Sequence, residues 1–328
     1  MARTVTVGAG SLHALVGPHA RATIAAALED PARTDTSLIN DLQAAVDDTN
    51  HHVGSLPFVR LQLLLSPVLE TCRRLLASEL PPPALRGLHT VAAQAFTLAG
   101  RIAFETYDDA ASCALYTEAT EVAGHLPTWC RAVVHMSHAL VTLYATPGTD
   151  TARVLVEAAI RDARTGDNPA VRSRAHALHS EIAARSGDRS QALTALSLAR
   201  YDIGDTTRDD PLRARFSPGH LRGFEGLCAL HTGDAATAEP HFADATAALT
   251  NPRDRLQRWI ITADQALARI RSGNPVEGTA LLHTCADEVS ATGGRVPTLR
   301  LRRTRHALRP WHGERFVTEL DDHFLTMR

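Results

Sequence analysis

The chain has 328 residues, of which 44% are hydrophobic and 21% charged, so a chain that is disordered throughout is excluded. A formal net charge of −2 at pH 7 argues against a protein dedicated to nucleic acid or to a membrane surface. All 34 basic residues are arginine, which excludes a phosphate-loop lysine, a Schiff-base lysine and a lysine general base.

Cysteine usage and hydropathy indicate the compartment. No apolar run is long enough for a membrane span, and the first residues lack the apolar core of a signal peptide. The cysteines never occur in Cys-x-x-Cys spacing. These features predict a cytoplasmic protein without membrane contact, in which the thiols are small buried side chains. The five cysteines are Cys72, Cys113, Cys130, Cys228 and Cys285.

The first quarter of the chain shows two kinds of segment. Residues 1–34 are interrupted by glycine, alanine and proline, and they predict a weakly ordered N-terminal segment. Residues 35–84 predict N-terminal capping helices. Within them, residues 36–50 form a polar amphipathic pattern, and the apolar stretch 57–77 contains Pro67, which is expected to kink or break its helix.

A repeated pattern occupies residues 85–294. Each repeat is a helical stretch, a tight turn and a second helix, in which a small residue is followed by apolar residues three and four positions later. The small residues that anchor the second helices are Ser112, Ala152, Ala192, Ala238 and Gly278. Glycines precede the last three anchors by five positions, at Gly187, Gly233 and Gly273. We expect these glycines to end the first helices in the left-handed conformation, and the Asp or Asn that follows each to cap the second helix.

The repeats predict the fold class. One helical hairpin cannot bury its apolar face alone, whereas a stack of five can. The sequence therefore predicts an all-α protein, a solenoid of about five helical hairpins. Residues 295–328 predict C-terminal capping helices, a basic one followed by an apolar one.

The hairpin pattern resembles tetratricopeptide (TPR) repeats of the longer variety, which form a right-handed superhelix. Residues 176–199 and 223–249 are similar to the C-terminal TPR sensing region of XRE-type helix-turn-helix transcriptional regulators of high-GC Gram-positive bacteria. Residues 32–76 resemble the segment that joins the DNA-reading domain to the repeats in that family. Too few residues precede this segment for the DNA-reading helix-turn-helix domain, so we expect that this chain lacks one.

The resemblance implies that the first helix of each hairpin lines a concave groove. Such a groove suits a peptide or protein segment, or a small molecule whose carboxylate would meet Arg101 or Arg174. The alternative is that these positions only pack one helix against another. The candidate groove residues are Gln94, Arg101, Phe104, Ser137, Val141, Tyr144, Arg174, Glu181, His220 and Leu227.

Other candidate sites are weaker. The pairs His135/His138 and His176/His179 each share a helix face, but their repeat phases differ by one position, about 100° of rotation, so no metal is predicted. The arginine-rich segment 295–309 suits phosphate or an acidic partner, but a solvated face of the capping helix explains it equally well. Direct nucleic-acid binding is therefore not expected.

The sequence contains no catalytic motif and indicates no cofactor. We expect a non-enzymatic sensing or adaptor protein of bacterial regulation that binds a peptide or protein segment in its groove and could form a homodimer. One alternative is a repurposed TPR-like protein of a natural-product pathway, which holds a precursor or performs an acid–base step with His220, Glu181 or Tyr144. A second alternative is the sensing half of a DNA-binding regulator.

Overall fold

The computed structural model describes residues 18–166, 168–205 and 216–326. These residues form an all-α fold with fifteen α-helices, three short 3-10 helices and no strand. The α-helices are α2 (Pro18–Glu29), α3 (Thr36–His51), α4 (Phe58–Leu76), α5 (Pro82–Glu105), α6 (Asp109–Ala123), α7 (Thr128–Ala145), α8 (Asp150–Arg164), α9 (Pro169–Arg185), α10 (Arg189–Gly204), α11 (Pro218–His231), α12 (Ala235–Ala248), α13 (Arg255–Arg271), α14 (Pro275–Thr292), α15 (Arg295–Ala307) and α16 (Arg315–Thr326). The 3-10 helices are η2 (Pro31–Arg33), η3 (Pro252–Asp254) and η4 (Arg309–Trp311).

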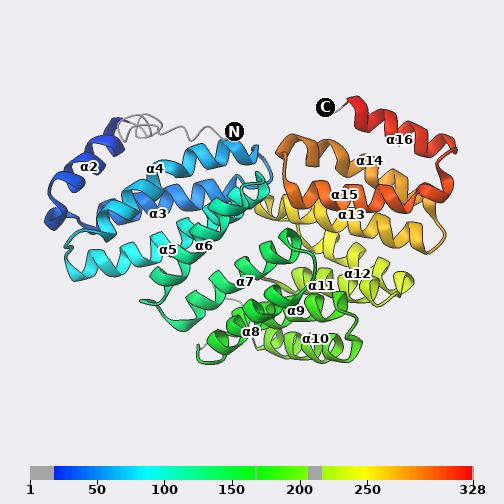
Figure 1. Ribbon diagram of the computed structural model, residues 1–328, viewed down its shortest axis with the longest axis horizontal. Coiled ribbons are helices and arrows are strands. Elements are labelled where there is room, and N and C mark those ends of the chain that lie inside the picture. Colours follow the sequence, from blue (N-terminus) through cyan, green and yellow to red (C-terminus); the bar gives the residue numbers. More distant parts are fainter. Residues whose placement is uncertain (1–17, 167, 206–215, 327–328) are drawn as a thin grey trace.

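Ten of these helices form five consecutive pairs, and the two members of each pair pack against each other (Figure 1). A turn of only three or four residues joins the members of a pair. The pairs are α5–α6, α7–α8, α9–α10, α11–α12 and α13–α14. None of the helices in the described residues is both long and apolar enough to span a membrane.

The turns within the pairs confirm the prediction made for the glycines. Gly187, Gly233 and Gly273 have φ angles of +85°, +89° and +88°, in the left-handed region that favours glycine. Asp188 accepts a hydrogen bond from the backbone N–H of Gln191 and so caps α10, and Asp234 caps α12 in the same way. The capping prediction is wrong for the Asn274 side chain, which makes no such bond.

The anchors of the second helices are buried, as the repeat pattern requires. Ser112, Ala152, Ala192 and Ala238 are each at most 2% exposed, and Gly278 lies against Ile270 of its partner helix. The residue four positions after each anchor is also buried. These residues are Tyr116, Val156, Leu196, Phe242 and Leu282.

Two predictions for the N-terminal quarter need correction. Part of the segment predicted to be weakly ordered forms α2, because Ile24 and Ala27, three positions apart, both bury on one helix face; residues 1–17 lie outside the described residues. Of the kink or break expected at Pro67, the break does not occur, because α4 runs from Phe58 to Leu76 as one helix. The carbonyl group that loses its N–H donor belongs to Leu63, an exposed residue, where water can replace the donor.

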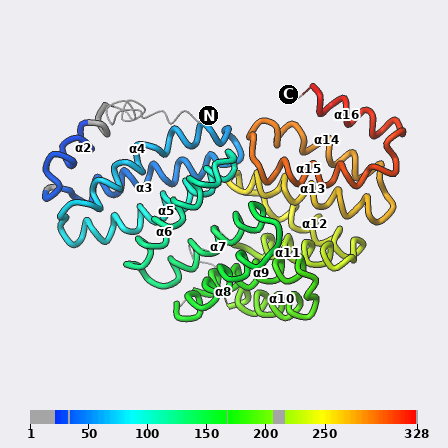
Figure 2. Tube along the Cα trace, in the orientation of Figure 1, coloured from blue at the N-terminus to red at the C-terminus, as the bar shows by residue number. Residues whose placement is uncertain are grey.

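The helices follow one another along an arch, and helices from the two halves of the chain contact each other where its ends meet (Figure 2). Gly54, between α3 and α4, approaches α13 so closely that a Cβ atom there would lie 2.9 Å from Leu256. Gly294, just before α15, lies against Phe58 in the same way, and Arg295 pairs with Asp109 at 2.5 Å. We call these contacts of residues 53–58 and 105–109 with residues 254–256 and 294–296 the seam.

Candidate functional site

A cluster of four charged side chains and one tyrosine lies where α7, α9, α13 and α15 converge. We call it the inner cluster, and it consists of Tyr144, Glu181, Arg185, Asp264 and Arg300. The side chains of Glu181 and Asp264 are 2% exposed and that of Arg300 is 4% exposed. Charges so deeply buried require partners, and the contacts of Arg185 and Arg300 with groups on other helices link the four helices.

Arg300 is the centre of the inner cluster. Its Nη1 donates to both carboxylate oxygens of Asp264, at 2.6 and 2.7 Å, and its Nη2 donates to the hydroxyl of Tyr144. The same Nη2 lies 3.5 Å from Oε1 of Glu181. One guanidinium from α15 thus meets a carboxylate of α13, a phenol of α7 and a carboxylate of α9.

Arg185 adds a second guanidinium from the end of α9. Its Nη2 donates to Oε1 of Glu181 and to the hydroxyl of Tyr144, both at 2.5 Å. The Cζ atoms of Arg185 and Arg300 lie 4.6 and 5.2 Å from the centre of the Tyr144 ring. Tyr144 therefore attracts both guanidiniums through its ring as well as through its oxygen.

Burial and the charges of neighbouring groups shift the pKa values of these side chains in opposite directions. Burial raises the pKa of Asp264 and of Tyr144, because each loses water around its charged form. Burial also acts to lower the pKa of Arg300, but the carboxylates of Asp264 and Glu181 outweigh it, and the pKa rises. Arg300 consequently stays charged.

Two further basic residues lie near the cluster, and both have a lowered pKa. Burial lowers the pKa of Arg303, on α15, and the neighbouring Arg300 lowers it further. Burial, with Arg185 and Arg303 nearby, lowers the pKa of His231 to about 2, so this histidine of α11 is neutral. The Nε atoms of Arg185 and Arg300 are buried without a hydrogen-bond partner among the described residues.

The N-terminus of α15 is held by a second set of contacts. The backbone N–H of Val296 donates to Oε2 of Glu105 at 3.0 Å, so a buried carboxylate from α5 caps the helix. The Arg295 guanidinium lies 4.4 Å from the ring centre of Phe104 and 5.2 Å from that of Tyr107. α15 is therefore attached at its first turn and again one turn and a half later, at Arg300.

This position of α15 corrects, for Arg295 and Arg300, the alternative that residues 295–309 are simply a solvated face; Arg302 and Arg309 are exposed. Arg300 is buried and Arg295 is 13% exposed, and both point to groups of other helices. The physical reason is that buried carboxylates at Glu105, Glu181 and Asp264 attract the arginines inward.

The structure brings some of the predicted groove residues together. Tyr144 and Glu181 meet in the inner cluster, and Phe104 lies under Arg295. Arg101, Ser137 and Arg174 surround another tyrosine, Tyr116. Its hydroxyl lies 2.8 Å from Oγ of Ser137, and both arginines act against the burial that raises its pKa.

The remaining predicted groove residues have separate surroundings. Val141 and Leu227 are buried in apolar clusters, and Gln94 accepts a hydrogen bond from Gln43 at 3.0 Å. His220 takes part in the capping box of α11: its Nδ1 accepts from the backbone N–H of Ser217, and its Nε2 lies 3.5 Å from Asp254. Helix capping thus accounts for the position of this imidazole ring.

Sequence reasoning missed three members of the inner cluster, Arg185, Asp264 and Arg300. A signal existed for Asp264, because it is the one acidic residue in the run Trp259–Ala268 of α13, which is otherwise apolar or uncharged. A lone carboxylate in such a run requires a buried partner. The identity of that partner, 36 positions away, follows only from the fold.

The paired histidines have carboxylate neighbours within their own repeats. His135 lies 3.6 Å from Asp162, to which Arg131 also donates two hydrogen bonds, and His176 lies 3.8 Å from Asp202, which Arg172 contacts. No group of three or more potential metal ligands occurs in the part of the chain that the structure describes. Among the cysteines, Cys72, Cys228 and Cys285 are buried as predicted, Cys130 is half-buried, and the prediction is wrong for Cys113, which is exposed.

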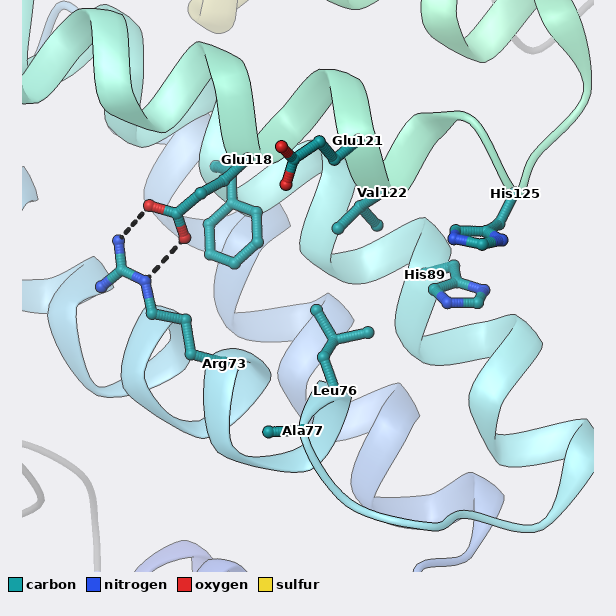
Figure 3. A pocket seen from close by; sticks show the side chains of 9 residues that line it. Arg73, Leu76, Ala77, His89, Glu118, Glu121, Val122 and His125 are labelled. Atoms are coloured by element: carbon teal, nitrogen blue, oxygen red, sulfur yellow. Dashed lines mark hydrogen bonds and ion pairs between the residues drawn. The ribbon is translucent and has the colours of Figure 1, made fainter.

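A cavity of about 400 Å³ lies between α4, α5 and α6 (Figure 3). Arg73 donates to Glu118 at 2.7 and 2.9 Å on one side, and the rings of His89 and His125 stack on the other, with centres 4.5 Å apart. Its arginine is already paired, which leaves little charge to attract a ligand.

The fold and the inner cluster together define an all-α protein of paired helices in which the basic helix α15 packs on α13 and contacts residues of α5, α7 and α9. No family model, curated protein or solved structure matches the chain.

Proposed function

We propose that this chain is a cytoplasmic TPR-like repeat protein, a non-enzymatic sensor or adaptor that binds a basic helical segment of a partner on its inner face, by which we mean the surface formed by Phe104 and the inner cluster. In this proposal the five helix pairs from α5–α6 to α13–α14 are its repeats, stacked as a right-handed solenoid, and the family resemblance in the sequence supports a role in bacterial regulation.

One observation carries the proposal: the basic helix α15 contacts residues that the repeat pattern in the sequence predicts to line a peptide groove. Arg295 meets Phe104, and Arg300 meets Tyr144 and Glu181. An inner face that holds arginines of its own chain in this way has the aromatic rings and buried carboxylates to hold those of a partner. A partner segment would compete with α15 for these positions.

The test uses a labelled synthetic peptide with the sequence of residues 293–309 and the full-length chain. The Arg295→Gln variant weakens the attachment of α15 while leaving the inner cluster intact, so we expect it to bind the peptide more tightly than the wild type. A matched peptide with glutamine at both positions 295 and 300 should bind at least 10-fold more weakly. Fluorescence anisotropy measures both affinities.

The outcomes are separable because circular dichroism reports whether the Arg295→Gln chain is folded. A folded variant that binds neither peptide, or binds both equally, would show that the inner face does not recognise a basic helix. A variant that unfolds is replaced by Asp109→Asn, which removes only the exposed partner of Arg295.

A further inference from the structure

A second cavity, of about 510 Å³, lies outside the inner face, between α14, α15 and α16. Its apolar side is formed by residues from all three helices, including Val289, Leu301 and Phe324. Its volume falls within the range of small-molecule sites in proteins, roughly 300–1,000 Å³. The cavity is bounded by three helices and open to solvent on one side, and its volume suits a small ligand better than a long segment of a partner.

The other side of the cavity is basic. Arg302, Arg305 and Arg309 follow one another at helical spacing, and His306 lies beside them. Arg305 is held in place by Asp321, to which its Nε and Nη2 donate at 2.5 Å each. The cavity lining, among the described residues, includes no carboxylate.

Arg302 and Arg309 differ from the other arginines of α15 and η4. Both are exposed, and neither makes a side-chain hydrogen bond or an ion pair with the described residues. Arg302 follows the buried Arg300 by two positions, which turns it by about 200° to the opposite face of the helix. The contacts that attach α15 to the inner face therefore do not account for these two arginines.

We propose that this cavity binds a small amphiphilic anion. The guanidiniums of Arg302 and Arg309 hold its acidic head group, a carboxylate or a phosphate, because a guanidinium offers paired N–H donors that match either one. The apolar body of the ligand lies on Val289, Leu301 and Phe324. The site is independent of the inner face and of any peptide bound there.

The experiment titrates the full-length chain with three probes of equal chain length, below their aggregation concentrations. Decanoate and decyl phosphate carry the acidic head group, and decanol is the uncharged control. Calorimetry should show saturable binding of at least one acid, at least 10-fold tighter than that of decanol. The acid that binds more tightly identifies the head group.

Two matched double variants locate the site. Arg302→Gln with Arg309→Gln removes both guanidiniums without breaking a contact, so the chain should fold and bind the acid at least 10-fold more weakly. Arg60→Gln with Arg74→Gln removes two exposed arginines of α4 and should leave the affinity unchanged.

The proposal is overturned if neither acid binds at 1 mM, if decanol binds as tightly as the acids, or if the variant at Arg302 and Arg309 retains wild-type affinity. Equal losses in both double variants would also overturn it, since they would show attraction to net positive charge rather than to this cavity.

Discussion

Gly100 and Gly226 occupy the same position in two different helix pairs, twelve residues before the anchors Ser112 and Ala238. In each pair a large ring of the second helix fills the space that a side chain would need. A Cβ atom would lie 3.0 Å from Tyr116 at position 100 and 2.6 Å from Phe242 at position 226. The size of the ring on one helix is thus matched to the absence of a side chain on the other.

Gly226→Ala should destabilise the protein, because the ring of Phe242 is fully buried and has no room to move. We expect a loss of about 1–3 kcal/mol in the free energy of unfolding, measured by urea denaturation. Adding Phe242→Leu should restore part of this loss, although Phe242→Leu alone is destabilising. Strictly additive effects of the two substitutions would contradict the close contact.

Arg300→Met should destabilise the protein by about 3–5 kcal/mol, because it leaves the carboxylate of Asp264 buried without its partner, whereas Glu181 keeps Arg185. The double variant Arg300→Met with Asp264→Asn removes that charge as well. Urea denaturation should show it to be more stable than Arg300→Met alone. If Asp264→Asn instead adds its full cost to the first substitution, the two side chains are not coupled.

Sequence reasoning at the residue scale identified Tyr144 and Glu181, because the repeat pattern places both on the helix face that was assigned to the groove. It did not identify Arg300, since helical periodicity says which face a residue occupies but not which distant helix meets that face. For the same reason the arginines of residues 295–309 could be interpreted either as a binding strip or as a solvated face, and neither interpretation anticipated the burial of Arg300.

The turns within the helix pairs were the most predictable elements, because the left-handed glycine and the capping aspartate act over a few residues. The left-handed turn occurs even without glycine: Tyr107 takes the glycine position in the first pair, with a φ angle of +65°. The unbroken course of α4 through Pro67 was not predictable, because tertiary packing stabilises a helix that local propensity disfavours.

Two glycine substitutions in the α9–α10 pair separate conformation from packing, since a Cβ atom would meet nothing within 4 Å at either position. Gly187→Ala should destabilise the protein by about 1–2 kcal/mol, because alanine disfavours the left-handed conformation. Gly204→Ala, at the last residue of α10, should be neutral or raise stability by up to about 1 kcal/mol. Thermal denaturation compares the two, and equal effects would contradict the argument from φ.

For the whole molecule, buried histidines make stability depend on pH. Burial lowers the pKa of His231 to about 2, and Arg185, Arg303, Arg300 and Arg271 from three neighbouring helices lower it too. His231 thus stays neutral in the folded state but takes up a proton in the unfolded state below about pH 6.5. Acidification therefore favours unfolding, and the stability present above pH 6.5 is lost as the pH falls.

His231→Gln removes this proton uptake. Between pH 7 and pH 5.5 the variant should lose about 1 kcal/mol less stability than the wild type, as measured by urea denaturation at both values. Parallel losses in the two proteins would show that His231 does not titrate differently on unfolding. The comparison uses differences within each protein, so any constant cost of the substitution cancels.

The all-α class could be predicted from the sequence because the helix periodicity recurs in all five repeats and the glycine turn in three of them. The closure of the arch could not, because it depends on the sum of small rotations between successive helix pairs, which no local pattern records. Nothing in the sequence marks Gly54 as a neighbour of Leu256, or Glu105 as the cap of a helix 191 positions further on.

The seam has a consequence for the order in which the chain acquires its structure. Contacts within one helix pair join residues close in sequence and form quickly, whereas the bond between Val296 and Glu105 closes a loop of 191 positions. The seam therefore forms last, after the pairs between its two sides are in place. A nascent chain on the ribosome would hold its helix pairs as an open arc until η3 and α13 emerge and meet residue Gly54, and the contacts of α15 would then complete the closed molecule.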